Sequence, residues 1–231
     1  NKDNIKFRGD FAKNVKKKNS ILNTLKILRR KKIITNHYSV LVDKKIPVFA
    51  GLGGGTSNAF FLTKHFIKSK IDNNLFNILE KKIGSDFRLF SYNQGFLKNL
   101  KNINSYKKKY KLHFLIVYPN IKSSTRHIYS KVGKYSSKFT YNFNKINNKD
   151  KFIKLLQGKN NDLQKIVEKK YPVIKKLIID ISHQKGCCYS RISGSGSVCY
   201  GLFKSSKNAK SALMKVKKKY PNFWSTVAKT I

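Results

Sequence analysis

The feature that most constrains this chain is a glycine-rich stretch between positions 46 and 59. Four of the five residues from Gly51 to Gly55 are glycine, so the backbone there can adopt positive φ angles and approach a ligand closely. Thr56 to Asn58 follow, and we expect them to cap a helix that continues to about Ile67. A flexible loop that ends at a helix N-terminus presents unpaired N–H groups and the positive end of the helix dipole. The stretch therefore predicts a phosphate-binding site.

Two common phosphate-loop patterns do not fit this stretch. The P-loop pattern G-x-x-x-x-G-K-(S/T) fails because Thr56, not a lysine, follows the last glycine. The dinucleotide pattern G-x-G-x-x-G fails because Thr56 stands where the third glycine belongs. A plain glycine-rich surface turn is the remaining alternative, and the cap residues and the apolar helix that follow argue against it.

The stretch is similar to the ATP loop of the GHMP small-molecule kinases, P-x-x-x-G-L-G-(S/G)-(S/G)-(S/T)-(S/A). The triple glycine followed by Thr-Ser-Asn-Ala looks most like the 4-diphosphocytidyl-2-C-methyl-D-erythritol kinase branch of that superfamily. The ATP-binding residues that this resemblance implies are Pro47, Val48, Phe49, Ala50, Gly51, Leu52, Gly53, Gly54, Gly55, Thr56 and Ser57.

The formal charge of +41 raises the question of nucleic-acid binding, since dense Lys and Arg attract phosphate backbones. The lysines are scattered from Lys2 to Lys229 and no element concentrates them. Arg, which bidentate phosphate and base recognition favours, is scarce beside Lys. We therefore attribute the high positive charge to a general bias in composition and expect no dedicated nucleic-acid partner. The charge still helps to attract anionic small molecules such as nucleotides.

Length and composition indicate a folded protein, with 231 residues, of which 40% are hydrophobic. The longest apolar run, Leu112 to Tyr118, is too short for a membrane span, and no signal peptide opens the chain. We expect a cytoplasmic protein without a membrane partner, a monomer or weak dimer. Cys187, Cys188 and Cys199 fit reduced core thiols better than a disulfide or metal site.

The expected elements fall into two domains, residues 1–110 and 111–231. After an opening polar stretch, the first half is expected to contain a helix at 15–31, a strand at 38–42, the loop helix, a helix at 75–82 ended by Gly84, and a hairpin from 87–92 and 94–97. In the second half, strands at 112–118, 188–192, 197–203 and 223–229 alternate with helices at 172–181 and 208–220, with a loop at 136–161 that carries a short helix. This order is the split βαβ, ferredoxin-like arrangement.

The GHMP resemblance implies the same α+β fold. Its two parts are an N-terminal ATP-binding domain of the ribosomal protein S5 domain 2-like type and a ferredoxin-like C-terminal domain.

Asp86 is the candidate catalytic residue. It follows a helix end, and a carboxylate near a substrate hydroxyl can take its proton during phosphoryl transfer. Alone, it is better explained as a turn-forming aspartate; beside the glycine loop we favour catalysis. The resembling segment G-(A/S)-D-V-P-F-F carries the catalytic aspartate at this position. Arg88 replaces its proline, a change that either tilts the aspartate or adds positive charge near phosphate.

Two further segments match the family in the second half. Ser193 to Ser197 matches S-G-S-G-S-C and is otherwise an ordinary hairpin turn; its hydroxyls and N–H groups can hold anionic oxygens. By resemblance, Tyr129, four residues after Thr125, stacks on the cytosine of the substrate, the alternative being a core tyrosine. The substrate-binding residues implied are Thr125, Tyr129, Gly194, Ser195 and Gly196.

The resemblance implies ATP-dependent phosphorylation of the 2-hydroxyl of 4-diphosphocytidyl-2-C-methyl-D-erythritol, in the non-mevalonate route to isoprenoid precursors. Mg²⁺ is expected with ATP, and no metal ligand is identified. The alternatives are a catalytically inactive ATP-binding remnant and a GHMP kinase for another small alcohol. The matches begin near Asn4, and the family's first strand, with a catalytic lysine and a Tyr-His pair that grips the cytidine, has no counterpart. We expect either a fragment of the enzyme or a shortened, inactive version.

Overall fold

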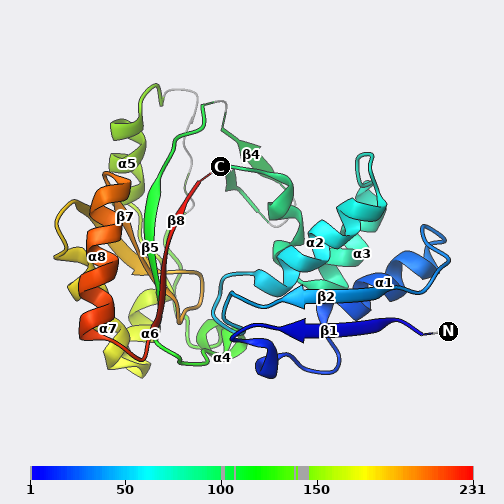
Figure 1. The fold of residues 1–231 in the computed structure, drawn as a ribbon. Coiled ribbons are helices and arrows are strands. Elements are labelled where there is room, and N and C mark those ends of the chain that lie inside the picture. Colours follow the sequence, from blue (N-terminus) through cyan, green and yellow to red (C-terminus); the bar gives the residue numbers. More distant parts are fainter. Residues whose placement is uncertain (1, 100–101, 107, 138, 140–145, 231) are drawn as a thin grey trace. The chain divides into compact units, whose positions relative to one another are not determined.

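The computed structural model describes residues 2–99, 102–106, 108–137, 139 and 146–230 (Figure 1). The chain divides into two compact units: Asn1–Val48 with Gly53–Ser105, and Phe49–Leu52 with Tyr106–Ile231. The glycine-rich stretch therefore passes from the first unit into the second and back. Residues 138 and 140–145 of the loop expected at 136–161 lie outside the described residues.

The first unit contains a two-stranded parallel sheet. Strand β1 (Asn4–Arg8) pairs with β2 (Ser39–Asp43), with Ile5 opposite Val40 and Phe7 opposite Val42. A polar stretch without a strand was expected in place of β1, and this expectation was wrong. The apolar residues of β1 alternate with Asn and Lys, so one face of the strand packs against the core while the other is exposed.

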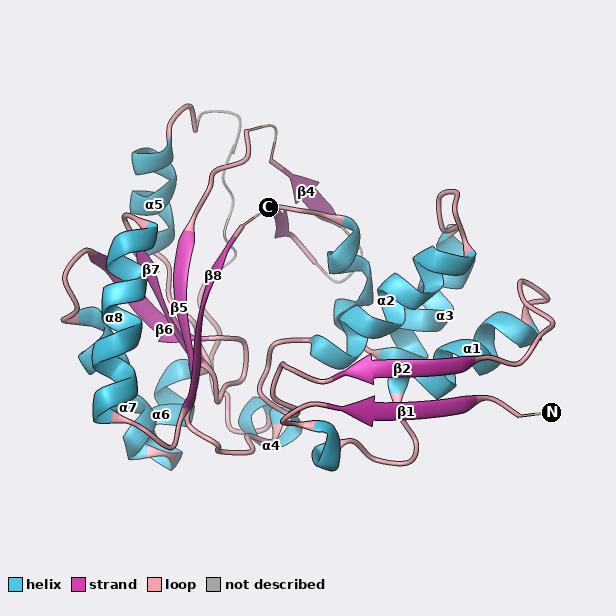
Figure 2. Ribbon diagram, in the orientation of Figure 1, coloured by secondary structure: helices cyan, strands magenta, loops and turns pink. Residues whose placement is uncertain are grey.

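Helices cover one face of this sheet (Figure 2). Helix α1 (Ser20–Arg30) is capped by Asn19, which accepts a hydrogen bond from the Leu22 N–H at 3.0 Å. Helices α2 (Gly54–Phe66) and α3 (Asn73–Ile83) pack beside it, and a short 3₁₀ turn, η1 (Ala12–Asn14), follows β1. Their apolar faces meet in one core, whose members include Leu25, Leu28, Phe60, Leu79 and Phe87.

Of the hairpin expected from 87–92 and 94–97, the first strand was wrong, whereas a strand does form at 95–97. Residues Ser85–Ser91 form a 3₁₀ helix, η2. Phe87 is fully buried and meets the rings of Phe60 and Phe76 edge-on, so long-range packing decides the conformation here. The hairpin lies further along the chain, where β3 (Gly95–Leu97) pairs antiparallel with β4 (Ile103–Ser105).

The second unit is ferredoxin-like, as the sequence predicted. Its four strands lie in the order β6-β7-β5-β8, and every neighbouring pair is antiparallel. The strands are β5 (His113–Tyr118), β6 (Cys187–Ile192), β7 (Cys199–Phe203) and β8 (Trp224–Lys229). Helices α7 (Pro172–Ser182) and α8 (Ser206–Lys219) connect them and pack on one face. Pro172 occupies the first turn of α7, where its missing N–H costs nothing.

Three shorter helices complete the second unit: α4 (Thr125–Tyr129), α5 (Lys149–Gln157) and α6 (Gln164–Lys170). The loop residues Ala50 and Leu52 pack with Tyr118 and Val198 in a small cluster of this unit. Within the described ranges, no helix has the length and apolar character needed to cross a bilayer.

Candidate active site

The second half of the glycine-rich stretch forms the N-terminus of α2. Gly53 is the N-cap, in the left-handed conformation with φ 62°, and its carbonyl accepts the Ser57 N–H at 2.8 Å. The helix thus begins before Thr56, and no side chain caps it, so the N-cap role expected of Thr56 to Asn58 was wrong. The first amides of α2, from Gly54 on, have no acceptor within the described part of the chain, which leaves them open to an anion.

Positive φ angles recur at every second residue ahead of α2. Phe49, Gly51 and Gly53 have φ of 60°, 75° and 62°, and the residues between them do not share that sign. Backbone nests that bind anions combine left-handed with right-handed residues, so positive φ angles in this stretch are compatible with such a site. Two of these positions are glycine because a left-handed backbone strains residues with a Cβ.

Asp86 lies in the first unit, on a segment that begins against the first turn of α2. A Cβ added to Gly84 would lie 3.0 Å from the Thr56 hydroxyl, so the chain passes close to this turn. Asp86 itself is exposed, and the Ser85 hydroxyl donates to its carboxylate at 3.4 Å. The structure thus brings Thr56 of the glycine-rich stretch beside the segment that carries the candidate carboxylate.

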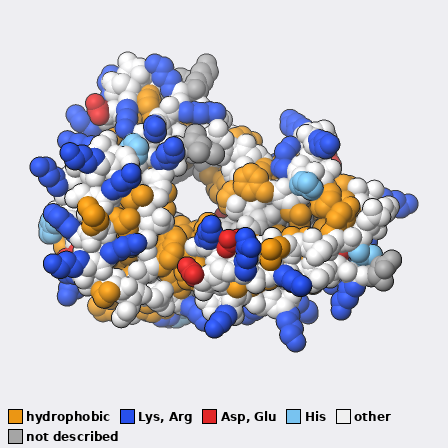
Figure 3. All heavy atoms as spheres, viewed as in Figure 1, with side chains coloured by type: hydrophobic (Ala, Val, Ile, Leu, Met, Phe, Trp, Pro, Cys, Tyr) orange, Lys and Arg blue, Asp and Glu red, His pale blue; other side chains and the backbone are white. Residues whose placement is uncertain are grey.

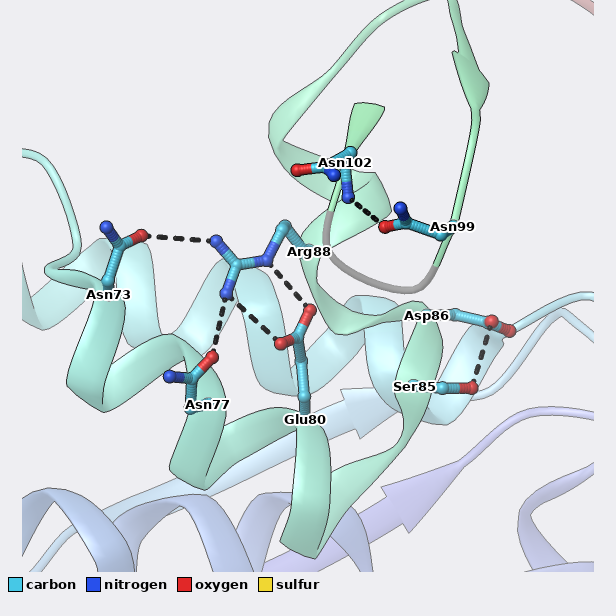
Figure 4. A network of polar contacts seen from close by, with 8 residues as sticks. All are labelled: Asn73, Asn77, Glu80, Ser85, Asp86, Arg88, Asn99 and Asn102. Atoms are coloured by element: carbon cyan, nitrogen blue, oxygen red, sulfur yellow. Dashed lines mark hydrogen bonds and ion pairs between the residues drawn. The ribbon is translucent and has the colours of Figure 1, made fainter. Parts of the chain in front are cut away.

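Arg88 points away from Asp86 (Figure 4). Its Nε and Nη2 donate to the two Glu80 oxygens at 3.0 and 3.1 Å. Asn73 and Asn77 accept further hydrogen bonds from the guanidinium, which also lies 4.5 Å from the centre of the Phe76 ring. The Arg88 charge is therefore neutralised within the α3–η2 contact, and the expected additional charge near phosphate is not supplied by this conformation.

In the second unit, the turn after β6 contacts the glycine-rich stretch. The Ser193 hydroxyl donates to the Gly51 carbonyl at 3.2 Å. A Cβ on Gly51 would lie 2.9 Å from the Gly196 carbonyl oxygen, closer than side chains tolerate. Two segments selected separately from the sequence therefore meet at van der Waals distance.

The same turn contacts the region of Thr125. The Thr125 and Ser195 hydroxyls are 2.9 Å apart, and the Ser123 hydroxyl donates to the Ser195 carbonyl at 2.8 Å. Tyr129, at the end of α4, is 50% exposed, so it is not a core tyrosine. Its ring is open to a ligand, as stacking on a base requires.

Two residues near these segments were not selected from the sequence. The Asn161 amide donates to the Gly194 carbonyl at 2.8 Å while its oxygen accepts the Leu163 N–H at 3.0 Å, so Asn161 holds the turn as well as shaping the start of α6. Lys44 is buried beside Gly54. In a chain with 51 Lys and Arg residues, composition gives no signal that singles out one lysine.

Other reactive side chains are structural. The three cysteines are free thiols, and burial raises the pKa of Cys187 to about 12. His65 packs edge-on against Phe66. Over the described residues, no three His, Cys, Asp or Glu side chains gather in a way that could hold a metal ion.

The basic charge is spread widely. Figure 3 shows Lys and Arg side chains scattered over the visible face, without a single stripe. Such a distribution supports a general attraction of anions more than a defined track for a nucleic-acid backbone.

Comparison with known proteins gives a consistent set of relatives. Residues 142–222 match the family model described as GHMP kinases C terminal. A protein of Pelagibacter ubique (strain HTCC1062) named 4-diphosphocytidyl-2-C-methyl-D-erythritol kinase is 37% identical to this chain, over 98% of this chain and 82% of the relative. A protein of the same name from Wolbachia sp. subsp. Brugia malayi (strain TRS) is 32% identical, over 95% and 77%. A crystal structure of 4-(cytidine 5′-diphospho)-2C-methyl-D-erythritol kinase, 17% identical, covers 100% of this chain and 83% of its own with a TM-score of 0.69, which supports the fold.

Proposed function

This chain belongs to the 4-diphosphocytidyl-2-C-methyl-D-erythritol kinases of the GHMP superfamily, and from that premise we propose that it phosphorylates the 2-hydroxyl of 4-diphosphocytidyl-2-C-methyl-D-erythritol with ATP. The product is an intermediate of the non-mevalonate route to isoprenoid precursors. The observation that carries the proposal for the site is the closeness of Gly84 to Thr56. It places the beginning of the segment that carries Asp86 next to the N-terminus of α2.

The backbone of Gly51 to Ser57 binds the phosphates of ATP. The amides at the start of α2 donate to phosphate oxygens, and the helix dipole adds favourable potential. During the reaction a bond forms between the substrate oxygen and the γ-phosphorus, while the bond from that phosphorus to the β–γ bridging oxygen breaks. The Asp86 carboxylate orients the hydroxyl and accepts its proton.

The second unit recognises the alcohol substrate. Thr125 and the turn from Gly194 to Gly196 present hydroxyl and amide groups to its polar oxygens, supported by the Thr125–Ser195 contact of 2.9 Å. The exposed Tyr129 ring stacks on the cytosine. Because Tyr129 recognises the base, its replacement by Ala raises the KM for this substrate more than the KM for ATP.

Mg²⁺ is expected to arrive with ATP. When bound, the ion neutralises charge on the phosphates as the phosphoryl group is transferred. Mg²⁺ commonly takes only one or two carboxylates beside phosphate oxygens and waters. Among the described residues no cluster of His, Cys, Asp or Glu is placed to hold the ion, and no protein ligand is assigned.

The test is a phosphotransfer assay on the full-length protein as encoded, with ATP and the cytidine substrate, followed by ³¹P NMR of the product. Asp86→Asn is expected to lower kcat by about 10²- to 10⁴-fold. Asp150→Asn, an exposed aspartate in the first turn of α5, is the matched control and keeps kcat. Unchanged turnover in Asp86→Asn contradicts the proton-acceptor role. ATP binding without transfer by the wild-type protein contradicts the kinase assignment and favours an ATP-binding remnant.

A further inference from the structure

Lys44 is held by main-chain bonds at the end of the β1–β2 pair. Its N–H donates to the Arg8 carbonyl at 2.7 Å, and its carbonyl accepts the Phe11 N–H at 3.3 Å. The side chain reaches from this fixed backbone to the first residue of α2. Lys44 is only 6% exposed, although lysine is usually among the most exposed residues.

The Lys44 ammonium lies at the first residue of α2. Its Nζ is 3.1 Å from the point that a Cβ on Gly54 would occupy. Within the ranges that the structure describes, this nitrogen has no hydrogen-bond or ion-pair partner. The adjacent carboxylate, Asp43, pairs instead with Arg8 and Lys45, each at 3.7 Å.

This placement is electrostatically unfavourable without an anion. Partial removal of an unpaired cation from water is costly, and burial accordingly lowers the pKa of the Lys44 ammonium. The N-terminus of a helix adds a further positive potential of about half an elementary charge. A phosphate between the ammonium and the first amides of α2 satisfies both groups.

We propose that Lys44 binds a phosphate oxygen of the nucleotide directly, together with the N-terminal amides of α2. The inference rests on the proposed function and adds a residue to its nucleotide site. Lysine suits this role as a compact point charge with three donors. Because the contact exists before and during transfer, Lys44 acts on nucleotide affinity more than on kcat.

Gly54 leaves room for the Lys44 ammonium at the start of α2. A methyl group there would press on the far end of the Lys44 side chain, which can move at little cost. Gly54→Ala is therefore expected to shift the ammonium by a few tenths of an ångström while the chain remains folded. It supplies a second variant that leaves Lys44 itself in place.

The test measures binding of ATP, inorganic triphosphate and adenosine by isothermal titration calorimetry. Lys44→Met is expected to weaken ATP and triphosphate binding at least tenfold and to leave adenosine binding unchanged. Lys45→Met is the matched control, because the Lys45 side chain is 81% exposed, and it stays within twofold of wild type. Gly54→Ala, with circular dichroism to confirm folding, is expected to weaken triphosphate binding by less than Lys44→Met.

The inference would be overturned if both Lys44→Met and Gly54→Ala bound triphosphate with wild-type affinity. It would also be overturned if Lys45→Met lost as much affinity as Lys44→Met, or if the wild-type chain bound no triphosphate. Failure of the proposed function is distinguishable. A wild-type protein that binds triphosphate through Lys44 but transfers no phosphoryl group contradicts the kinase assignment alone. A protein that transfers normally after loss of Lys44, with unchanged KM for ATP, contradicts this inference alone.

Discussion

The Ser193 hydroxyl donates a hydrogen bond to the carbonyl of Gly51, 142 residues earlier in the chain, at 3.2 Å. The contact joins the glycine-rich stretch to the turn that follows β6, and it requires that Gly51 have no side chain. The Gly196 carbonyl oxygen would lie only 2.9 Å from a Cβ there. Backbone fit between two loops, more than any side-chain pair, sets the position of this part of the phosphate-binding stretch.

Gly51→Ala is expected to destabilise the second unit and weaken ATP binding. The new methyl group meets a backbone oxygen, and the left-handed φ of 75° adds strain of roughly 1–2 kcal/mol. Gly133→Ala is the control, because an added Cβ at Gly133 meets nothing within 4 Å. Thermal melting and ATP titration of both variants measure the difference, and equal behaviour would show that the loop relaxes freely.

Much of the fold could be predicted because its signals are local. Asn19 and Asp72 each accept a hydrogen bond from an N–H three residues on, so capping residues in the sequence mark the starts of α1 and α3. The helix expected from position 15 begins only after this cap, at Ser20. Pro172 at the first turn of α7 is a similar signal. The order of strands and helices in the second half was confirmed for the same reason, since each element carries its own apolar period.

The remainder depends on contacts between distant residues. The segment around Phe87 has aromatic and apolar residues suited to a strand, but burial of its ring between Phe60 and Phe76 fixes a 3₁₀ helix. In the candidate site, each motif could be identified in the sequence by itself, but the spatial relation between the motifs could not. The contact between the Gly51 and Ser193 segments could not be predicted, because it forms only in the folded chain. The same holds for the position of the Lys44 ammonium beside the first residue of α2.

Asn161 is expected to act as a positioning residue for the Gly194 turn. Its amide donates to the Gly194 carbonyl at 2.8 Å, so Asn161→Ala removes the bond. Asn161→Asp is expected to be worse, because a carboxylate facing that carbonyl repels it. The KM for the alcohol substrate should rise in the order wild type, Ala, Asp, with the KM for ATP nearly constant. A purely structural role would instead lower thermal stability equally in both variants without this order in KM.

Arg88 is expected to stabilise the first unit without taking part in the reaction. Its pair with Glu80 is well shielded, with the two side chains 14% and 15% exposed. Arg88→Met leaves the Glu80 carboxylate unpaired and is expected to lower the free energy of unfolding by roughly 2–4 kcal/mol. The double variant Arg88→Met with Glu80→Leu should recover part of this loss in urea denaturation. A large fall in kcat at temperatures where Arg88→Met remains folded would contradict the structural role.

Asp3 is expected to make the stability of the first unit depend on pH. Burial by itself raises the pKa of Asp3, but the Arg29 hydrogen bonds and the Tyr38 N–H outweigh it, so the pKa lies below the usual 3.8. The stabilisation is complete above the unfolded-state pKa and disappears as pH falls through the lower folded-state value. Asp3→Asn should therefore be less stable than wild type at pH 7 by roughly 1–3 kcal/mol and should converge with it in acid. Asp10→Asn, at an exposed position, is the control. Its free energy of unfolding should not differ from that of the wild type in this pH-dependent way.

Lys44 is expected to cost stability in the absence of nucleotide. Burial lowers its pKa in the folded chain below the usual 10.5, so the unfolded chain holds this proton more tightly. The cost is therefore complete below the folded-state pKa and shrinks as pH rises toward and past 10.5. Lys44→Met, which keeps a similar shape without the charge, should unfold with a free energy about 1 kcal/mol higher than wild type at pH 7. Urea denaturation at pH 7 and pH 10 should show this advantage decreasing. Saturating ATP should offset or reverse it, because ATP binds the wild type more tightly and therefore stabilises it more than the variant. A variant less stable than wild type without nucleotide would mean that the ammonium is already paired in the folded protein.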